Sequence, residues 1–143
     1  MESPRTKRGK FTVLFLLISA LLGIAILATD QNLSQYQPTH VYGLIAFVIV
    51  DIVLAGLVLV RGTRSFLQIS GIWGLLQALI MLSDIFWPSP FGSAFAISQA
   101  DFARYLFGLA FYDTKHIAYL FPSLFVVLIL VLVVGMWESR GAK

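Results

Sequence analysis

Residues 41–60 read VYGLIAFVIVDIVLAGLVLV and contain one charged group, the side chain of Asp51. A helix needs about 20 consecutive apolar residues to cross the hydrocarbon core of a membrane. This stretch has that length, and Asp51 is its one residue that is charged at neutral pH. It therefore predicts a membrane-spanning helix that carries a carboxyl group near mid-membrane.

Three further apolar runs accompany this stretch, at residues 11–29, 66–87 and 117–137. Each is long enough to cross a membrane. Lipid offers no partners for bare backbone N–H and C=O groups, so each run is expected to be a helix. We predict an all-α fold, an integral membrane four-helix bundle that forms a single membrane domain over residues 1–143.

The composition supports lipid as the surroundings of this chain. Hydrophobic residues make up 59% of the sequence and charged residues 12%, whereas soluble domains have about 45–50% and about 25%. A soluble fold of 143 residues cannot bury that much apolar surface, so the lipid bilayer is the first predicted partner. The chain has no cysteine, which excludes disulfides, thiolate metal sites and cysteine nucleophiles.

The basic residues predict the orientation of the bundle. Eight of the ten Lys and Arg residues precede residues 11–29, follow residues 117–137, or lie between the second and third runs: Arg5, Lys7, Arg8, Lys10, Arg61, Arg64, Arg140 and Lys143. Loops rich in Lys and Arg stay on the cytoplasmic side. We therefore expect a multi-pass protein of the cell membrane with both termini in the cytoplasm. An even number of spans agrees with this, because it places both termini on the same side.

An additional helix is expected outside the membrane, between the third and fourth spans. The sequence WPSPFG at 87–92 ends the third span, and SQAD at 98–101 matches a capping box. A helix over residues 99–112 would be amphipathic and would lie at the membrane interface. It is interpreted as a cover on the outer ends of the spans, or alternatively as a docking surface.

Polar and small residues of the third span recur at helical spacing. Ser70, Gly74, Gln77, Met81 and Asp84 follow one another at intervals of four, three, four and three residues, which predicts a stripe that faces the bundle interior. Such a stripe would present its amide and carboxyl groups to the neighbouring helices instead of to lipid.

Asp51 and Gln77 are expected to meet within the membrane. Both lie about 15 Å below the outer boundary, at 1.5 Å per residue. The four-residue sequence RGTR at 61–64 joins the second and third spans as antiparallel neighbours. Trp73, between Gly71 and Gly74, is assigned to core packing, with stacking on a ligand as the alternative.

The charge state of Asp51 leaves two interpretations open. A charged Asp at a helix centre costs about 2.5–3.5 kcal/mol, and no Lys or Arg lies within a span to neutralise it. A protonated Asp51 would donate to the Gln77 amide oxygen and accept from its NH₂ group. The pair is then a structural clasp between two helices, which we favour, or Asp51 is a proton- or cation-binding site.

Histidines and acids at the outer ends of the spans suggest a second kind of site. His40 and His116 each stand one residue before a span, and Asp113 lies one helical turn before His116. Such ligands suit zinc, copper or iron, and two histidines at one depth suit a haem. These residues match no ligand motif, so metal or haem is a minor hypothesis and no cofactor is assigned.

The sequence favours a non-catalytic role. It contains no G-x-S-x-G, H-E-x-x-H, P-loop or G-x-G-x-x-G pattern. The leading hypothesis is a small accessory or assembly subunit of a larger membrane complex, whose partners are other membrane subunits or further copies of itself and not nucleic acid. The alternatives are a proton-coupled transporter or channel that uses Asp51 with Gln77, and a haem- or metal-binding redox protein that uses His40 and His116.

Overall fold

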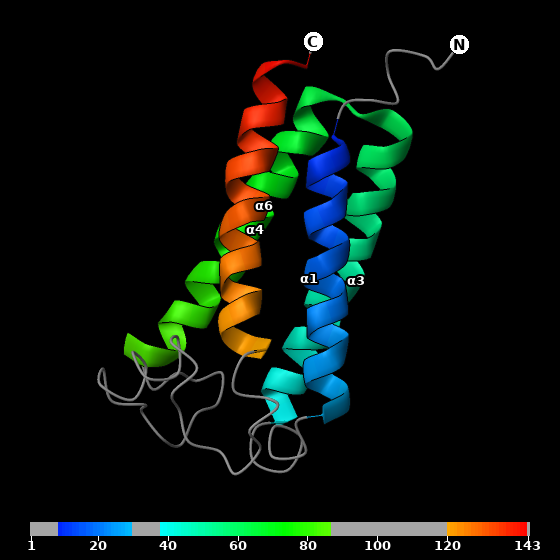
Figure 1. The fold of residues 1–143 in the computed structure, drawn as a ribbon. Helices are drawn as coiled ribbons and strands as arrows, with labels where there is room; N and C mark the ends of the chain where they lie inside the picture. The colour runs from blue at the N-terminus through cyan, green and yellow to red at the C-terminus, as the bar shows by residue number, and fades with distance from the viewer. Residues whose placement is uncertain (1–8, 30–37, 87–119, 143) are drawn as a thin grey trace.

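Four helices make up almost all of the described part of the chain. The computed structural model describes residues 9–29, 38–86 and 120–142, which form α1 (Lys10–Thr29), α3 (Pro38–Arg61), α4 (Arg64–Phe86) and α6 (Leu120–Arg140), as Figure 1 shows. Each of the four is long and apolar enough to cross a membrane. The prediction of an all-helical chain with four candidate spans is therefore confirmed.

The helix ends differ from the apolar runs because capping sets them. α3 begins at Pro38 instead of residue 41, since proline is favoured in the first helical turn, and α3 continues to Arg61. Gly62 ends α3 with a φ of 53°, and its N–H donates to the Val58 carbonyl at 2.8 Å. Glycine adopts this left-handed conformation at little cost. Two residues therefore separate α3 from α4, where the sequence suggested four.

The fourth helix continues beyond the end of its apolar run. α6 covers Leu120–Arg140, whereas the apolar run suggested residues 117–137. Its last turn thus contains polar side chains that hydropathy alone assigned to the tail. The expected interfacial helix over residues 99–112 lies outside the described residues.

The helices pair in a way that chain order does not suggest. α1 packs on α3, α4 packs on α6, and α1 packs on α6 to join the two pairs. α3 and α4 are consecutive, yet they diverge from their shared turn and contact each other much less (Figure 1). The start of α1, the α3–α4 turn and the end of α6 lie at one end of the bundle. Which side of a membrane that end faces stays a prediction.

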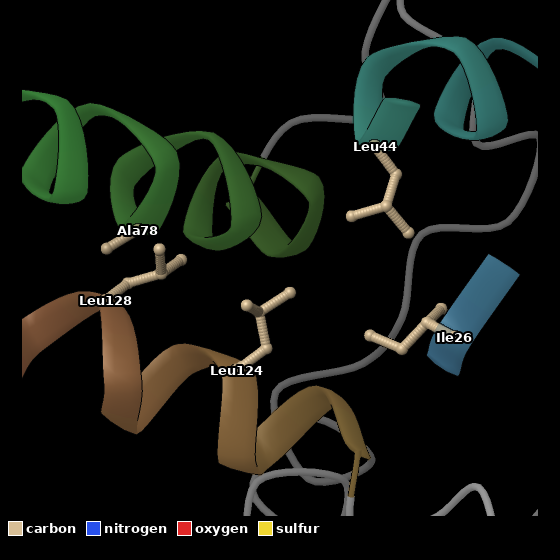
Figure 2. Packing of buried hydrophobic residues seen from close by; sticks show 5 residues of the cluster. All are labelled: Ile26, Leu44, Ala78, Leu124 and Leu128. Carbon is tan, nitrogen blue, oxygen red and sulfur yellow. The ribbon is translucent and has the colours of Figure 1, made fainter. Parts of the chain in front are cut away.

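Apolar side chains fill the bundle in three clusters along its length. Figure 2 shows the cluster farthest from the α3–α4 turn, in which side chains from all four helices point toward one another: Ile26, Leu44, Ala78, Leu124 and Leu128. The middle cluster contains Leu16, Leu54, Ala55, Val127 and Val131. The third, beside the turn, contains Val58, Leu67 and Ala142. A polar side chain that lies between two of these clusters is therefore surrounded by apolar side chains on both sides along the bundle.

Glycine allows α4 and α6 to pack backbone against backbone. A Cβ atom on Gly74 would stand 2.8 Å from the Leu128 carbonyl oxygen, and one on Gly135 would stand 2.9 Å from the Gly71 nitrogen. Small residues at membrane helix interfaces permit this close approach. The α4–α6 contact, instead of the short turn between α3 and α4, therefore determines the main neighbour of α4.

A carboxyl group joins the ends of the first and last helices. Glu138 of α6 accepts hydrogen bonds from the Thr12 hydroxyl at 2.6 Å, the Thr12 backbone N–H at 3.0 Å and the Phe11 backbone N–H at 3.3 Å. The first N–H groups of a helix have no partner within the helix. Glu138 thus caps α1 from a neighbouring helix.

Candidate functional site

Asp51 is buried at the middle of the bundle. It is the fourteenth of the 24 residues of α3, and its side chain is 1% exposed. Val48 precedes it by one helical turn and Leu54 follows it by one, and both are buried apolar residues. The carboxyl group thus lies in an apolar layer, where its oxygens need hydrogen-bond donors from the protein itself.

Helix α4 provides two donors to one oxygen of this carboxyl group. Gln77 donates from Nε2 to Asp51 Oδ1 at 2.9 Å, and Trp73 donates from Nε1 to the same oxygen at 2.8 Å. Trp73 and Gln77 are four residues apart on α4, so their side chains lie on one face of the helix, one above the other. Both N–H groups are obligate donors, so Oδ1 is an acceptor whatever the charge of the acid.

The contact between Asp51 and Gln77 differs from the expected one in its second hydrogen bond. The sequence suggested that the two side chains exchange two hydrogen bonds. In the structure Gln77 donates one, and the second donor is Trp73. The spacing of Trp73 and Gln77 is the signal that could have identified this donor, because a buried indole N–H generally has a hydrogen-bond acceptor.

The Trp73 ring also has the packing role that the sequence suggested. It meets the Phe47 ring edge to face, with centroids 5.5 Å apart and an interplanar angle of 86°. Aromatic pairs prefer this arrangement to a face-to-face stack. Trp73 therefore connects α4 to α3 by two means, a polar one at Asp51 and an apolar one at Phe47.

Ser19 brings a third helix to the carboxyl group. Its side chain in α1 is 2% exposed, and its hydroxyl interacts with the Asp51 carboxyl without the geometry of a hydrogen bond. The sequence signal was the spacing of Ser19 and Gly23, two small residues four positions apart, which is typical of helix contacts in membranes. Gly23 does face α3, because a Cβ atom there would lie 2.6 Å from Val48.

Ser70 and Gly74 belong to the same α4 stripe but do not join this cluster. Ser70 is buried, and its hydroxyl donates to the Phe66 carbonyl of its own helix at 2.8 Å. Gly74 lies against Leu128 and Val131 of α6. The Asp84 side chain lies outside the described residues. The stripe is thus divided: Gln77 contacts α3, whereas Gly74 contacts α6.

The proposed histidine site is only partly within the described residues. His40 lies in the first turn of α3 and is partly buried, while His116 and Asp113 lie outside the described ranges. Across residues 9–29, 38–86 and 120–142, no three His, Cys, Asp or Glu side chains are grouped closely enough to hold a metal ion. The metal or haem hypothesis therefore stays an untested prediction.

The arrangement as a whole is a carboxyl group among three helices that accepts two hydrogen bonds from α4 and has the Ser19 hydroxyl of α1 beside it. Ser19 comes from α1, Asp51 from α3, and Trp73 and Gln77 from α4. We use the name Asp51 cluster for these four residues. Comparison of this chain with models of protein families, with curated proteins and with solved structures gives no match.

Proposed function

We propose that this chain is a small non-catalytic accessory or assembly subunit of a larger complex in the cell membrane, with both termini in the cytoplasm. The observation that carries the proposal is the double donation of Trp73 and Gln77 to one oxygen of Asp51. It makes the carboxyl group part of the packing of the bundle. The acid then serves to keep a helical scaffold in one shape, which is the property that an assembly subunit needs.

The position of these hydrogen bonds supports a structural role. α3 and α4 diverge from their turn and contact each other far less than α4 contacts α6. The bonds from Trp73 and Gln77 to Asp51 cross this sparsely packed junction. Hydrogen bonds between membrane helices contribute about 0.6 kcal/mol on average and up to about 1.7 kcal/mol. Two of them on one oxygen would hold α3 and α4 at a fixed separation.

The outer surface of α3 supports a partner in the membrane. α3 is the least covered of the four described helices, and large apolar side chains project from it: Tyr42, Ile49, Val53, Leu59 and Val60. Gly56 has open space on the same helix, with no atom within 4 Å of a Cβ built there. A transmembrane helix of a partner subunit could approach α3 closely at this point.

Cross-linking from α3 tests this proposal against simple contact with lipid. A photo-crosslinking residue would replace Ile49 in the full chain, expressed in its native membrane, and a matched variant would carry it at Leu21 of α1. Both side chains are exposed, by 55% and 64%. We expect position 49 to link to one membrane protein that also co-purifies in mild detergent at a fixed ratio, and position 21 to link to lipid.

Two results would contradict the accessory role. One is that positions 49 and 21 both link to lipid alone, with the chain purifying by itself. The other is that position 49 links to a second copy of the chain and to no other protein. If position 49 does link to a membrane protein, deletion of the gene for this chain provides a second test. The deletion should lower the amount of the assembled partner complex in the membrane.

A further inference from the structure

The Ser19 hydroxyl is the one member of the Asp51 cluster that lacks a hydrogen bond. It is almost fully buried, and no atom of the described structure accepts from it or donates to it with hydrogen-bond geometry. The group it interacts with is the Asp51 carboxyl. A buried hydroxyl with no partner is unfavourable unless some state of the protein satisfies it. The Asp51 carboxyl is the neighbouring group that can provide such a partner.

The two donors from α4 restrict where a proton can bind on Asp51. Trp73 and Gln77 both direct N–H groups at Oδ1, and neither N–H group can accept a proton. A proton that binds the carboxyl group must therefore occupy Oδ2. The O–H group so formed needs an acceptor of its own, and in this apolar layer a hydroxyl oxygen can provide one.

Serine suits this position because its hydroxyl both donates and accepts. With Asp51 ionised, the Ser19 O–H group can donate to the carboxylate. With Asp51 protonated, a rotation of the hydroxyl hydrogen about the Ser19 Cβ–Oγ bond presents the oxygen as an acceptor for the new Oδ2–H group. One O–H bond forms on Oδ2, the proton comes from water, and the bonds from Trp73 and Gln77 to Oδ1 persist in both states.

We propose that Ser19 and Asp51 form a proton-binding site at the junction of α1, α3 and α4, in which Trp73 and Gln77 hold the carboxyl group in place. The protonation state of Asp51 then decides which group is the donor when Ser19 and Asp51 form a hydrogen bond: the Ser19 hydroxyl donates to the carboxylate, and the protonated acid donates to the Ser19 oxygen. This inference is independent of the accessory role, because the hydrogen bonds that support that role are the same in both protonation states.

No other charge of the described helices reaches the site. The titratable and charged residues of the helices around Asp51 stand toward helix ends: Lys10 on α1, Arg64 and Asp84 on α4, Glu138 and Arg140 on α6, and His40, Tyr42 and Arg61 on α3. At 1.5 Å per residue, Lys10 and Arg64 lie about 13 Å along their helices from Ser19 and Trp73. Any titration within the cluster therefore belongs to Asp51.

Infrared difference spectroscopy of the purified full chain in lipid nanodiscs tests the proposal. The C=O stretch of a protonated carboxylic acid would be followed as pH is changed, with protons as the probe. We expect a pH-dependent band that is absent from Asp51→Asn. Ser19→Ala should move the midpoint of this band to higher pH by about one unit. The reason is that a hydrogen bond from Ser19 stabilises ionised Asp51 more than protonated Asp51, so its loss disfavours the ionised form. Ser19→Thr, which keeps the hydroxyl, should restore the midpoint.

The control for a general loss of packing is Ser70→Ala. Ser70 is also a buried serine, but its hydroxyl is bonded to its own helix, so this variant should leave the band and its midpoint unchanged. The proposal is overturned if the band does not change with pH, if it persists in Asp51→Asn, or if Ser19→Ala and Ser70→Ala have the same effect. The two serine variants retain Asp51, so the test holds even if Asp51→Asn does not fold.

Discussion

The Thr12 hydroxyl and the Glu138 carboxyl, separated by almost the whole chain, are joined by a hydrogen bond of 2.6 Å. Thr12 lies in the first turn of α1 and Glu138 in the last turn of α6. These helices are antiparallel, so Glu138 stands where α1 has unpaired N–H groups and a partial positive charge. An acid is unfavourable at the carboxyl end of its own helix, and its contact with α1 offsets that cost.

Removal of this cap should destabilise the bundle at the end where α1 begins and α6 ends. Glu138→Ala takes the acceptor from two backbone N–H groups and one hydroxyl, and loss of an N-cap costs about 0.5–2 kcal/mol. The measurement is the free energy of unfolding in SDS, followed by far-ultraviolet circular dichroism. Glu138→Gln retains an acceptor oxygen and should lose less. Equal losses for the two variants would contradict a role for the carboxyl group as a cap.

The features that follow from a lipid environment could be predicted from the sequence. Each apolar run had to be a helix, because lipid cannot bond to bare backbone groups. The approach of Gln77 to Asp51 also followed from it, since a short turn makes α3 and α4 antiparallel and places both side chains at one depth. These inferences need only the length of each span and the order of the chain.

Features that depend on the rotation and pairing of helices could not be predicted in this way. The donation of Trp73 to Asp51 depends on how α4 is rotated about its axis, and the Glu138 cap depends on α6 lying beside α1. The short turn predicted that α3 and α4 are antiparallel neighbours, without indicating which helix packs most closely on α4. That helix is α6, where glycines let the two backbones approach closely, and hydropathy contains no information on that fit.

Loss of the acceptor at Asp51 should cost more than loss of its acidity. Asp51→Leu leaves the N–H groups of Trp73 and Gln77 buried without an acceptor, and each unsatisfied group costs about 1–3 kcal/mol. Asp51→Asn keeps an Oδ1 atom for both donors and should cost less than about 1 kcal/mol. SDS unfolding of the two variants provides the comparison. If Asn is as destabilising as Leu, the two N–H bonds to Oδ1 are not what stabilises this junction.

Trp73→Phe separates the polar and apolar roles of the indole. Phenylalanine keeps a ring to meet Phe47 but loses the N–H group that bonds Asp51, so we expect a loss of about 0.6–1.7 kcal/mol in the free energy of unfolding. The same substitution at Trp137, which is 63% exposed, should have little effect. In an Asp51→Leu background the cost of Trp73→Phe should largely disappear, because the acceptor is already gone. Additive losses would argue against direct coupling between the two side chains.

Glycine at the α4–α6 interface should not tolerate a methyl group. In Gly74→Ala the new Cβ atom would stand 2.8 Å from a backbone oxygen of α6, so the helices must separate, and overpacking of this kind costs about 1–3 kcal/mol. Gly56→Ala is the matched control, since its Cβ atom would meet nothing within 4 Å. It should be neutral or slightly stabilising, because alanine is the better helix former. If the two variants have similar free energies of unfolding, the backbones of α4 and α6 do not approach each other as closely at Gly74 as the structure shows.

The orientation in the membrane can be tested because the chain has no cysteine of its own. Thr63→Cys places a thiol in the α3–α4 turn, and Thr29→Cys places one at the last residue of α1, at the opposite end of the bundle. Arg61 and Arg64 flank Thr63, and short loops with basic residues stay in the cytoplasm. A membrane-impermeant maleimide should therefore label Thr29→Cys in intact cells, and Thr63→Cys after permeabilisation alone. Labelling of Thr63→Cys in intact cells would reverse the proposed orientation, and labelling of both positions in intact cells would contradict a bundle that crosses the membrane.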